Sequence, residues 1–289
     1  MQKVVWGAPS FWIERFPLYW GIEQSFFEKQ GIDLDIWYGY GASELTRAFS
    51  KGLIHIGELG LPPFVTAFRQ GLRAKIIGSS VVQQLDHYLA ARPDIASTAH
   101  LAGCRIGILS AGSCDDYFIR KMLSTHSIDP DRDVDLMPLG EDYGKLDLFI
   151  DGHVDAAFMV EPQLTRGEHE GLMRVIDRVA DYYPNYQWGI ILASEAWLQH
   201  QEDLLERLMY AFRQACRSIQ DRPGQTIDLG SRVFGVKPEV FENALKRDLP
   251  RWETDARLDM AGLQSAVGVQ EAIEESAADL SLDEMVSQL

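Results

Sequence analysis

The sequence is short of cysteine, short of basic residues and free of long apolar runs. Its 289 residues include three cysteines, whose spacing matches neither a metal site nor a disulfide framework. Lys and Arg together number 27 against 43 Asp and Glu, and the net charge of −16 argues against nucleic acid or an anionic membrane as partner, because both need a basic face. No stretch reaches the roughly 18 apolar residues of a membrane-spanning helix. We therefore expect no metal, no cofactor, no nucleic acid and no membrane insertion.

A secretion signal is also missing at the N-terminus, where no basic region is followed by an apolar core and a small-residue cleavage site. Two locations are consistent with this start. If Met1 stands in place of a removed signal peptide, the mature protein is periplasmic or otherwise extracytoplasmic. If it does not, the protein works in the cytoplasm.

What the sequence does contain is an alternation of strand and helix patterns. Apolar residues make up 46% of the chain and aromatic residues 10%, enough for a large core in one or two lobes. Short apolar runs, each followed by a loop and a helical pattern, lie at 3–6, 34–37, 54–57 and 74–77. This alternation favours an α/β class with a mainly parallel sheet. A long amphipathic helix is expected from Trp197 to Ile219, and further helices over residues 233–289.

The segment from Gly103 to Phe118 is the most informative stretch of the chain. A short apolar run leads through a glycine turn into a helical pattern, for which Ser113 has N-cap chemistry and Asp116 completes a capping box. The backbone N–H groups after Gly112 would open onto the end of a strand, where a ligand's oxygen atoms are readily held. An ordinary capped strand–helix junction accounts for the same residues.

The same pattern recurs over residues 34–49, where Ser43 takes the place of the cap. A second likeness joins residues 51–57 to 151–157, since both contain a helix end, a glycine and a short strand. The repeated order predicts one supersecondary unit used in two lobes, with chance similarity between two α/β halves as the alternative.

Residues 17–33, which read PLYWGIEQSFFEKQGID, resemble the first-helix signature of the nitrate, alkanesulfonate and thiamine-pyrimidine-precursor binding proteins. These proteins share the type II periplasmic binding protein fold. Further segments similar to that family are 41–43, 52–57, 103–107, 112–113, 152–156 and 161–162.

The resemblance implies an α/β fold of two lobes, each a mixed, mainly parallel sheet flanked by helices, with the C-terminal helices packed on lobe one. Lobe one would comprise residues 1–92 and 181–289, and lobe two residues 93–180, with a ligand cleft between them. In open α/β sheets ligands lie beyond the carboxyl ends of the strands, where both serine loops fall. Closure of the cleft would be a hinge motion.

By the same resemblance, Ser43 and Ser113 would donate hydrogen bonds to ligand oxygens, and several aromatic side chains would offer flat surfaces to a ring. The expected ligand-binding residues are Phe11, Trp12, Tyr38, Tyr40, Ser43, Leu59, Gly60, Gly112, Ser113, Cys114, Glu161 and Trp188. For the aromatic residues, a place in the core is the alternative. If Glu58, Asp115 and Glu161 face the cleft, their charge disfavours a bare oxyanion and suits an amine-bearing or neutral ring.

Cys114 and His55 keep a catalytic alternative open. A cysteine in the first turn of a helix has its thiolate favoured by the helix dipole, although Asp115 and Asp116 beside it act in the opposite sense. His55 stands where relatives carry an aspartate, and we interpret it as a neutral histidine hydrogen-bonded in the core.

The sequence thus predicts a protein that binds a small aromatic or heterocyclic molecule, bearing a pyrimidine, sulfonate or carboxylate, in an interlobe cleft. It would be the substrate-binding component of an ABC importer, with the importer's membrane subunits as partners. The alternative is a cytoplasmic enzyme on the same fold, desulfinase-, decarboxylase- or pyrimidine-synthase-like, acting on a small aromatic substrate through Cys114. The synthase's cysteine-rich iron motif would fall near residues 186–190, which read YQWGI and contain no cysteine.

Overall fold

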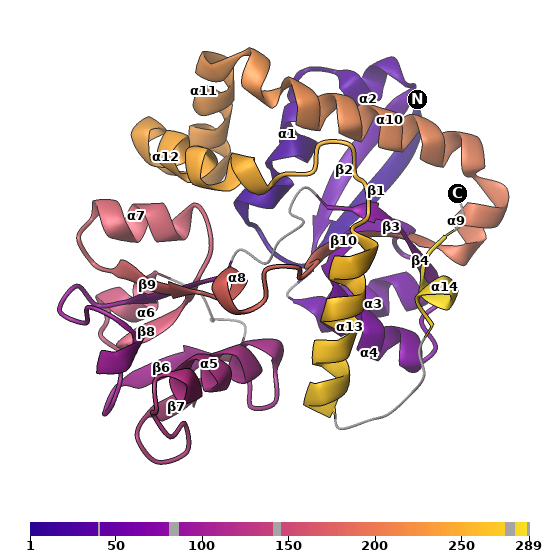
Figure 1. Ribbon diagram of the computed structural model, residues 1–289. Helices are drawn as coiled ribbons and strands as arrows, with labels where there is room; N and C mark the ends of the chain where they lie inside the picture. Colours follow the sequence, from indigo (N-terminus) through magenta and orange to yellow (C-terminus); the bar gives the residue numbers. More distant parts are fainter. Residues whose placement is uncertain (40, 81–86, 141–145, 275–280, 288–289) are drawn as a thin grey trace.

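The computed structural model describes residues 1–39, 41–80, 87–140, 146–274 and 281–287, and its strands form two five-stranded sheets (Figure 1). The first sheet has the order β2-β1-β3-β10-β4 and the second the order β7-β6-β8-β5-β9. The strands of the first sheet are β1 (Gln2–Ala8), β2 (Ile32–Tyr38), β3 (Ile56–Gly60), β4 (Ala74–Ser79) and β10 (Gly189–Ser194). Those of the second are β5 (Tyr88–Ala91), β6 (Arg105–Ile108), β7 (Asp135–Pro138), β8 (Ala156–Met159) and β9 (Arg174–Arg178).

The two sheets are built alike. In the first, β1 runs parallel to β2 and β3, while β10 is antiparallel to β3 and β4. In the second, β6 runs parallel to β7 and β8, while β5 is antiparallel to β8 and β9. Each sheet therefore takes one antiparallel strand from a segment that arrives from the other sheet. This arrangement confirms the predicted class of two mixed, mainly parallel sheets flanked by helices.

Helices cover both sheets, and we call each sheet with its helices a lobe (Figure 1). The helices are α1 (Phe16–Glu23), α2 (Phe26–Lys29), α3 (Ala42–Ser50), α4 (Leu61–Arg69), α5 (Cys114–Thr125), α6 (Asp147–Ile150), α7 (Gln163–His169), α8 (Val179–Tyr182), α9 (Glu195–His200), α10 (Glu202–Ser218), α11 (Pro223–Phe234), α12 (Pro238–Asp248), α13 (Met260–Glu274) and α14 (Leu282–Met285), and a 3₁₀ turn, η1, spans Ile13–Arg15. Along the part of the chain that the structure describes, no helix is long and apolar enough to cross a bilayer.

The boundary between the lobes differs from the sequence-based expectation at one strand. Residues 88–91 were expected in lobe one, but β5 pairs with β8 and β9 of the second sheet. All four residues are apolar and buried, so the strand is equally suited to the interior of either sheet. We therefore propose a first boundary before Tyr88, and lobe two then extends through β9.

The expected helix over residues 197–219 is two helices. Ser194 caps α9, where its hydroxyl accepts the Trp197 N–H at 3.4 Å, and the chain breaks at Gln201, whose φ of −134° is not helical. Helix α10 then packs its apolar face on the first sheet, with Phe212 stacked on Trp6 at 5.2 Å between ring centroids. The C-terminal helices α11 and α12 continue this layer, and Phe241 packs on Phe16.

Candidate functional site

A cavity of about 930 Å³ lies between the two lobes. Its walls come from segments at the ends of strands of both sheets: Pro9–Trp12 after β1, the residues Tyr38, Gly39, Gly41 and Ala42 at the end of β2, and Gly112–Asp115 after β6. Parallel strands that end at one edge place such loops side by side, which is where ligands of α/β proteins bind.

Nine of the twelve expected ligand-binding residues line this cavity. They are Phe11, Trp12, Tyr38, Leu59, Gly60, Gly112, Ser113, Cys114 and Trp188. Tyr40 lies outside the described residues. Ser43 and Glu161 are absent from the lining and need separate accounts.

Ser43 does not repeat the role of Ser113. The N-cap of α3 is Gly41, with a φ of 87° that favours glycine, so the helix begins before the serine and leaves it exposed in the first turn. Gly41 and Ala42 line the cavity instead. The likeness between the two serine loops therefore holds for the order of elements and not for the cap.

Glu161 is buried outside the cavity wall. Its carboxylate accepts the N–H and the hydroxyl of Thr165, at 3.1 and 2.8 Å, and pairs with Arg247 at 2.8 Å. A carboxylate placed before a helix satisfies the free N–H groups of the first turn, which accounts for its position ahead of α7. The expectation that it faces the cleft is not met in this structure.

Ser113 caps α5 as expected. Its hydroxyl accepts the Asp116 N–H at 3.3 Å, and the Asp116 carboxylate in turn accepts the Gly112 N–H at 2.7 Å. Arg120 donates to the same carboxylate at 2.7 Å. These hydrogen bonds rigidify the turn that forms the lobe-two wall of the cavity.

Cys114 lines the cavity beside Ser113, with its Sγ 3.7 Å from the Tyr186 hydroxyl. Burial raises the pKa of this thiol to about 12, and the hydrogen bond from Tyr186 only partly offsets that rise. A thiol held protonated at neutral pH is a poor nucleophile. The raised pKa therefore disfavours the catalytic alternative at Cys114.

His55 lies away from the cavity lining, at the start of β3. Its Nδ1 is 3.0 Å from the Ser194 hydroxyl and its ring stacks on Trp197 at 5.3 Å. This contact ties the residue before β3 to the cap of α9, and the His55 side chain is half-buried.

A buried charge cluster, of which the sequence suggested only Glu58, forms part of the wall in lobe one. Arg15 pairs with Glu58 at 2.7 Å and also with Glu14, and all three side chains line the cavity while being at most 4% exposed. Burial raises the pKa of Glu58 to about 7, the charge of Arg15 opposes this rise, and Glu14 adds to it. In the sequence, Glu14 and Arg15 are recognisable as two adjacent charges between the apolar residues Ile13 and Phe16, directly after the aromatic loop.

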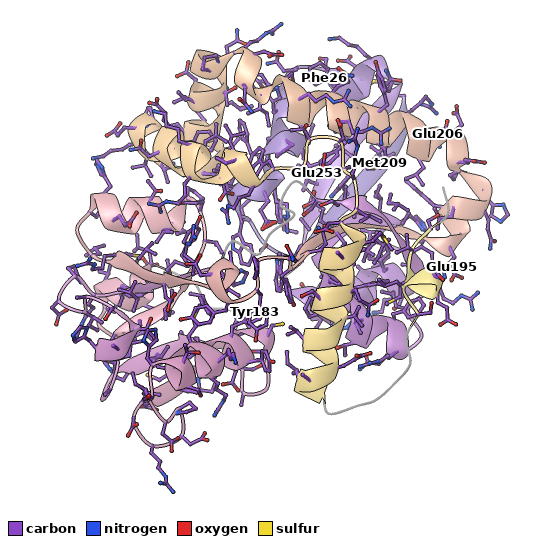
Figure 2. The ribbon with its side chains drawn as sticks, in the orientation of Figure 1. Phe26, Tyr183, Glu195, Glu206, Met209 and Glu253 are labelled. Carbon is purple, nitrogen blue, oxygen red and sulfur yellow. The ribbon has the colours of Figure 1, made fainter. Side chains whose placement is uncertain are left out.

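Aromatic rings gather beside this cluster. His87 packs on Trp188 at 4.9 Å and on Trp12 at 6.2 Å, and Trp188 stacks on Tyr186. A Cβ on Gly60 would lie 3.0 Å from the Trp188 ring, so a larger residue there would press on the indole where it packs on the strand. Tyr183, which follows α8, extends the aromatic cluster toward α5 and packs on Phe118 at 5.1 Å (Figure 2).

The charged side chains of the described lining are four carboxylates and two guanidinium groups. The carboxylates belong to Glu14, Glu58, Asp115 and Asp147, and the guanidinium groups to Arg15 and Arg166. Both arginines are already engaged, Arg15 within the buried cluster and Arg166 with Glu170 at 2.9 Å. Among the described residues, no group of three or more His, Cys, Asp or Glu side chains is placed to hold a metal ion.

Comparison with known proteins identifies a family and two relatives of this chain. Residues 12–226 match the model of the family described as NMT1/THI5 like. The chain is similar to the protein YtlA of Bacillus subtilis, 21% identical over 236 residues that cover 80% of this chain and 71% of that protein. It is also similar to the formylaminopyrimidine-binding protein of Halalkalibacterium halodurans, 22% identical over 245 residues that cover 82% and 73% of the two chains.

Among solved structures, the fold matches the alkanesulfonate-binding protein SsuA from Xanthomonas axonopodis pv. citri, bound to MOPS. The TM-score is 0.80 and the identity 17%, over 99% of this chain and 98% of that one. At this identity the match shows the fold alone. The ligand has to be inferred from the residues that line the cavity.

Proposed function

The chain belongs to the NMT1/THI5-like family, and we propose that it binds a small ring-bearing molecule in the interlobe cavity as the substrate-binding component of an ABC importer. An importer component of this kind works outside the cytoplasmic membrane. The family match, the two-lobe fold and the position of the cavity support this assignment.

Two relatives suggest different ligand classes, since one is named for a formylaminopyrimidine and the other for alkanesulfonates. The single observation that supports one class over the other is the charge of the cavity wall. Four carboxylates face two arginines, and both arginines already pair with carboxylates.

A sulfonate in this cavity would therefore approach carboxylates without a cation left to receive it among the described lining residues. Two like charges 4 Å apart at an effective dielectric constant near 20 repel by roughly 4 kcal/mol. Such a cost is close to a thousandfold in affinity. We infer that the ligand is neutral or cationic, with N–H groups that donate to carboxylates, and that an amine-bearing heterocycle fits this description.

The aromatic part of the wall fits the same ligand. Trp12, Trp188 and Tyr38 line the cavity together, and flat side chains pack favourably on a planar ring. A ring with amine groups at its edge would use both the aromatic surfaces and the carboxylates.

The test is a thermal-shift screen with four probes: an aminopyrimidine, its N-formyl derivative, an alkanesulfonate and nitrate. A ligand at a hundredfold excess over its dissociation constant stabilises the folded state by about 2.7 kcal/mol, which gives a clear rise in melting temperature. We expect a rise with the two pyrimidines only. A larger rise in melting temperature with the sulfonate would overturn the proposed ligand class. If no probe raises the melting temperature, the proposed ligand has no support, while the fold assignment is unaffected.

A further inference from the structure

Helix α12 of the first lobe lies against α7 of the second (Figure 1). Arg247 on α12 reaches across this contact. Its Nη1 lies 2.8 Å from Glu161 and its Nη2 lies 2.5 Å from Glu168. One guanidinium group thus pairs with two carboxylates of the other lobe.

The contact is built with complementary charge and aromatic packing. Glu161 is fully buried and Arg247 is 31% exposed, so the pair is shielded from solvent more than an ordinary surface ion pair. The guanidinium groups of Arg247 and Arg251 both lie over the Tyr88 ring of β5, at 5.6 and 5.3 Å from its centroid. Both arginines of α12 and its following turn therefore contact the second lobe.

The chain itself links the lobes at only two places among the described elements, between β4 and β5 and between β9 and β10. Two lobes joined by two short segments rotate relative to each other unless other contacts hold them. Helix α12 is separated from β10 by α9, α10 and α11, so neither link imposes its contact with α7, and a rotation of the lobes would break that contact.

The contact also touches the cavity through α7. Glu161 accepts two hydrogen bonds from Thr165 in the first turn of this helix, and Gln163 and Arg166 of the same helix line the cavity. The Glu161 carbonyl accepts the N–H of Ile13, a backbone hydrogen bond of 3.1 Å between the lobes. A movement of α7 away from α12 would separate the cavity walls.

We propose that Arg247, Glu161 and Glu168 form an interlobe ion bridge that holds the two lobes together around the cavity and slows the escape of a bound molecule. Arg247 is thus a positioning residue, because it acts through α7 and does not itself line the cavity. The part that concerns ligand escape rests on the proposed function, and the part that concerns lobe contact does not.

The experiment compares Arg247→Met with Lys246→Met by hydrogen exchange of the Ile13 amide and by solution X-ray scattering, without ligand. Lys246→Met is the matched control, because it removes the same charge from the same helix. The partner of Lys246, Glu242, lies on that helix and not in the other lobe. Hydrogen bonds to charged groups contribute enough that losing the bridge should speed Ile13 exchange by about tenfold or more. We expect this increase and a larger radius of gyration in Arg247→Met, and neither in Lys246→Met.

Unchanged exchange at Ile13 in a folded Arg247→Met protein would overturn the proposal. If that variant does not fold, Glu168→Gln takes its place, since it removes one partner that is 29% exposed and leaves the buried Glu161 pair intact. Faster Ile13 exchange with unchanged exchange at Ile191 in the core strand β10 then supports the bridge, and equal exchange at Ile13 refutes it.

A dissociation-rate measurement extends the test to function. With a pyrimidine that binds in the thermal-shift screen, Arg247→Met should release the ligand about tenfold faster than Lys246→Met. If no probe binds, the proposed function fails while the exchange result at Ile13 still decides the bridge. If a probe binds and both variants release it equally, the bridge does not control ligand escape.

Discussion

Arg15 Nη1 lies 2.7 Å from Glu58 Oε2 in the wall of the interlobe cavity, and neither side chain is more than 4% exposed. Arg15 comes from the turn after the first strand, and Glu58 from the adjacent strand β3. Because Glu14 also pairs with Arg15, two carboxylates share one cation at this point. The cluster carries a net negative charge when both are ionised, which is in keeping with the proposed N–H-donating ligand.

The cluster makes folding stability depend on pH. Burial raises the pKa of Glu58 from 4.5 to about 7, against the opposing charge of Arg15. Between these values the folded state binds more protons than the unfolded state, so the free energy of unfolding falls as pH rises from about 4.5 to about 7. The contribution that is lost is on the order of 3 kcal/mol.

Glu58→Gln removes this titration. Urea unfolding at pH 5 and pH 8 measures the effect. From pH 5 to pH 8 the free energy of unfolding of the variant should rise by about 2 to 3 kcal/mol relative to that of the unmodified protein. Glu206→Gln, on the exposed face of α10, is the matched control and should show no such gain (Figure 2). If the free energies of unfolding of Glu58→Gln and the unmodified protein differ by the same amount at both pH values, Glu58 does not have the raised pKa.

The thiol of Cys114 should resist alkylation. Since burial raises its pKa to about 12, the thiolate fraction at pH 8 is about a thousandfold below that of an ordinary cysteine. Iodoacetamide followed by peptide mass spectrometry should label Cys114 slowly in the folded protein and rapidly in urea. Rapid labelling in the folded state would revive the nucleophile alternative.

The two serine loops offer a paired test of capping. Ser113→Ala removes the acceptor of the Asp116 N–H and should lower the free energy of unfolding by about 1 kcal/mol. Ser43→Ala changes an exposed residue that is not an N-cap, and its effect should stay within about 0.5 kcal/mol. Chemical denaturation of both variants checks this, and equal losses would show that the loops are equivalent after all.

Trp188 should matter to ring-bearing ligands. Its indole lines the cavity and packs on His87 and Tyr186, so Trp188→Leu removes a flat, fixed surface. We expect affinity for an aminopyrimidine to fall about 10- to 100-fold. Trp197→Leu, which removes a ring outside the cavity lining, is the control. Fluorescence titration would measure both, and an equal affinity in Trp188→Leu would remove this ring from the site.

The sequence predicted the architecture and much of the cavity wall because both depend on local order. Ser113 and Asp116 stand at capping-box spacing, and at α5 the Ser113 hydroxyl accepts the Asp116 N–H while the Asp116 carboxylate accepts the N–H of Gly112, one residue before the cap. Loops such as Gly112–Asp115 follow directly from where a strand ends.

What the sequence left hidden depends on pairings between distant residues. Arg15 and Glu58 meet only because β1 and β3 are neighbours in the first sheet. Glu161 turned away from the cavity because Arg247, 86 positions later, pairs with it. Ser43 differs from Ser113 because α3 starts at a glycine with positive φ, a conformation that the serine pattern does not report.

Calorimetric titration of one aminopyrimidine and one alkanesulfonate at pH 8, into the unmodified protein and into Glu58→Gln, tests the central claim most directly. Our account predicts that the pyrimidine binds, that Glu58→Gln weakens it about tenfold or more through the loss of a charged acceptor, and that the sulfonate does not bind the unmodified protein. Tighter binding of the sulfonate than of the pyrimidine, or pyrimidine binding that is indifferent to Glu58→Gln, would contradict it.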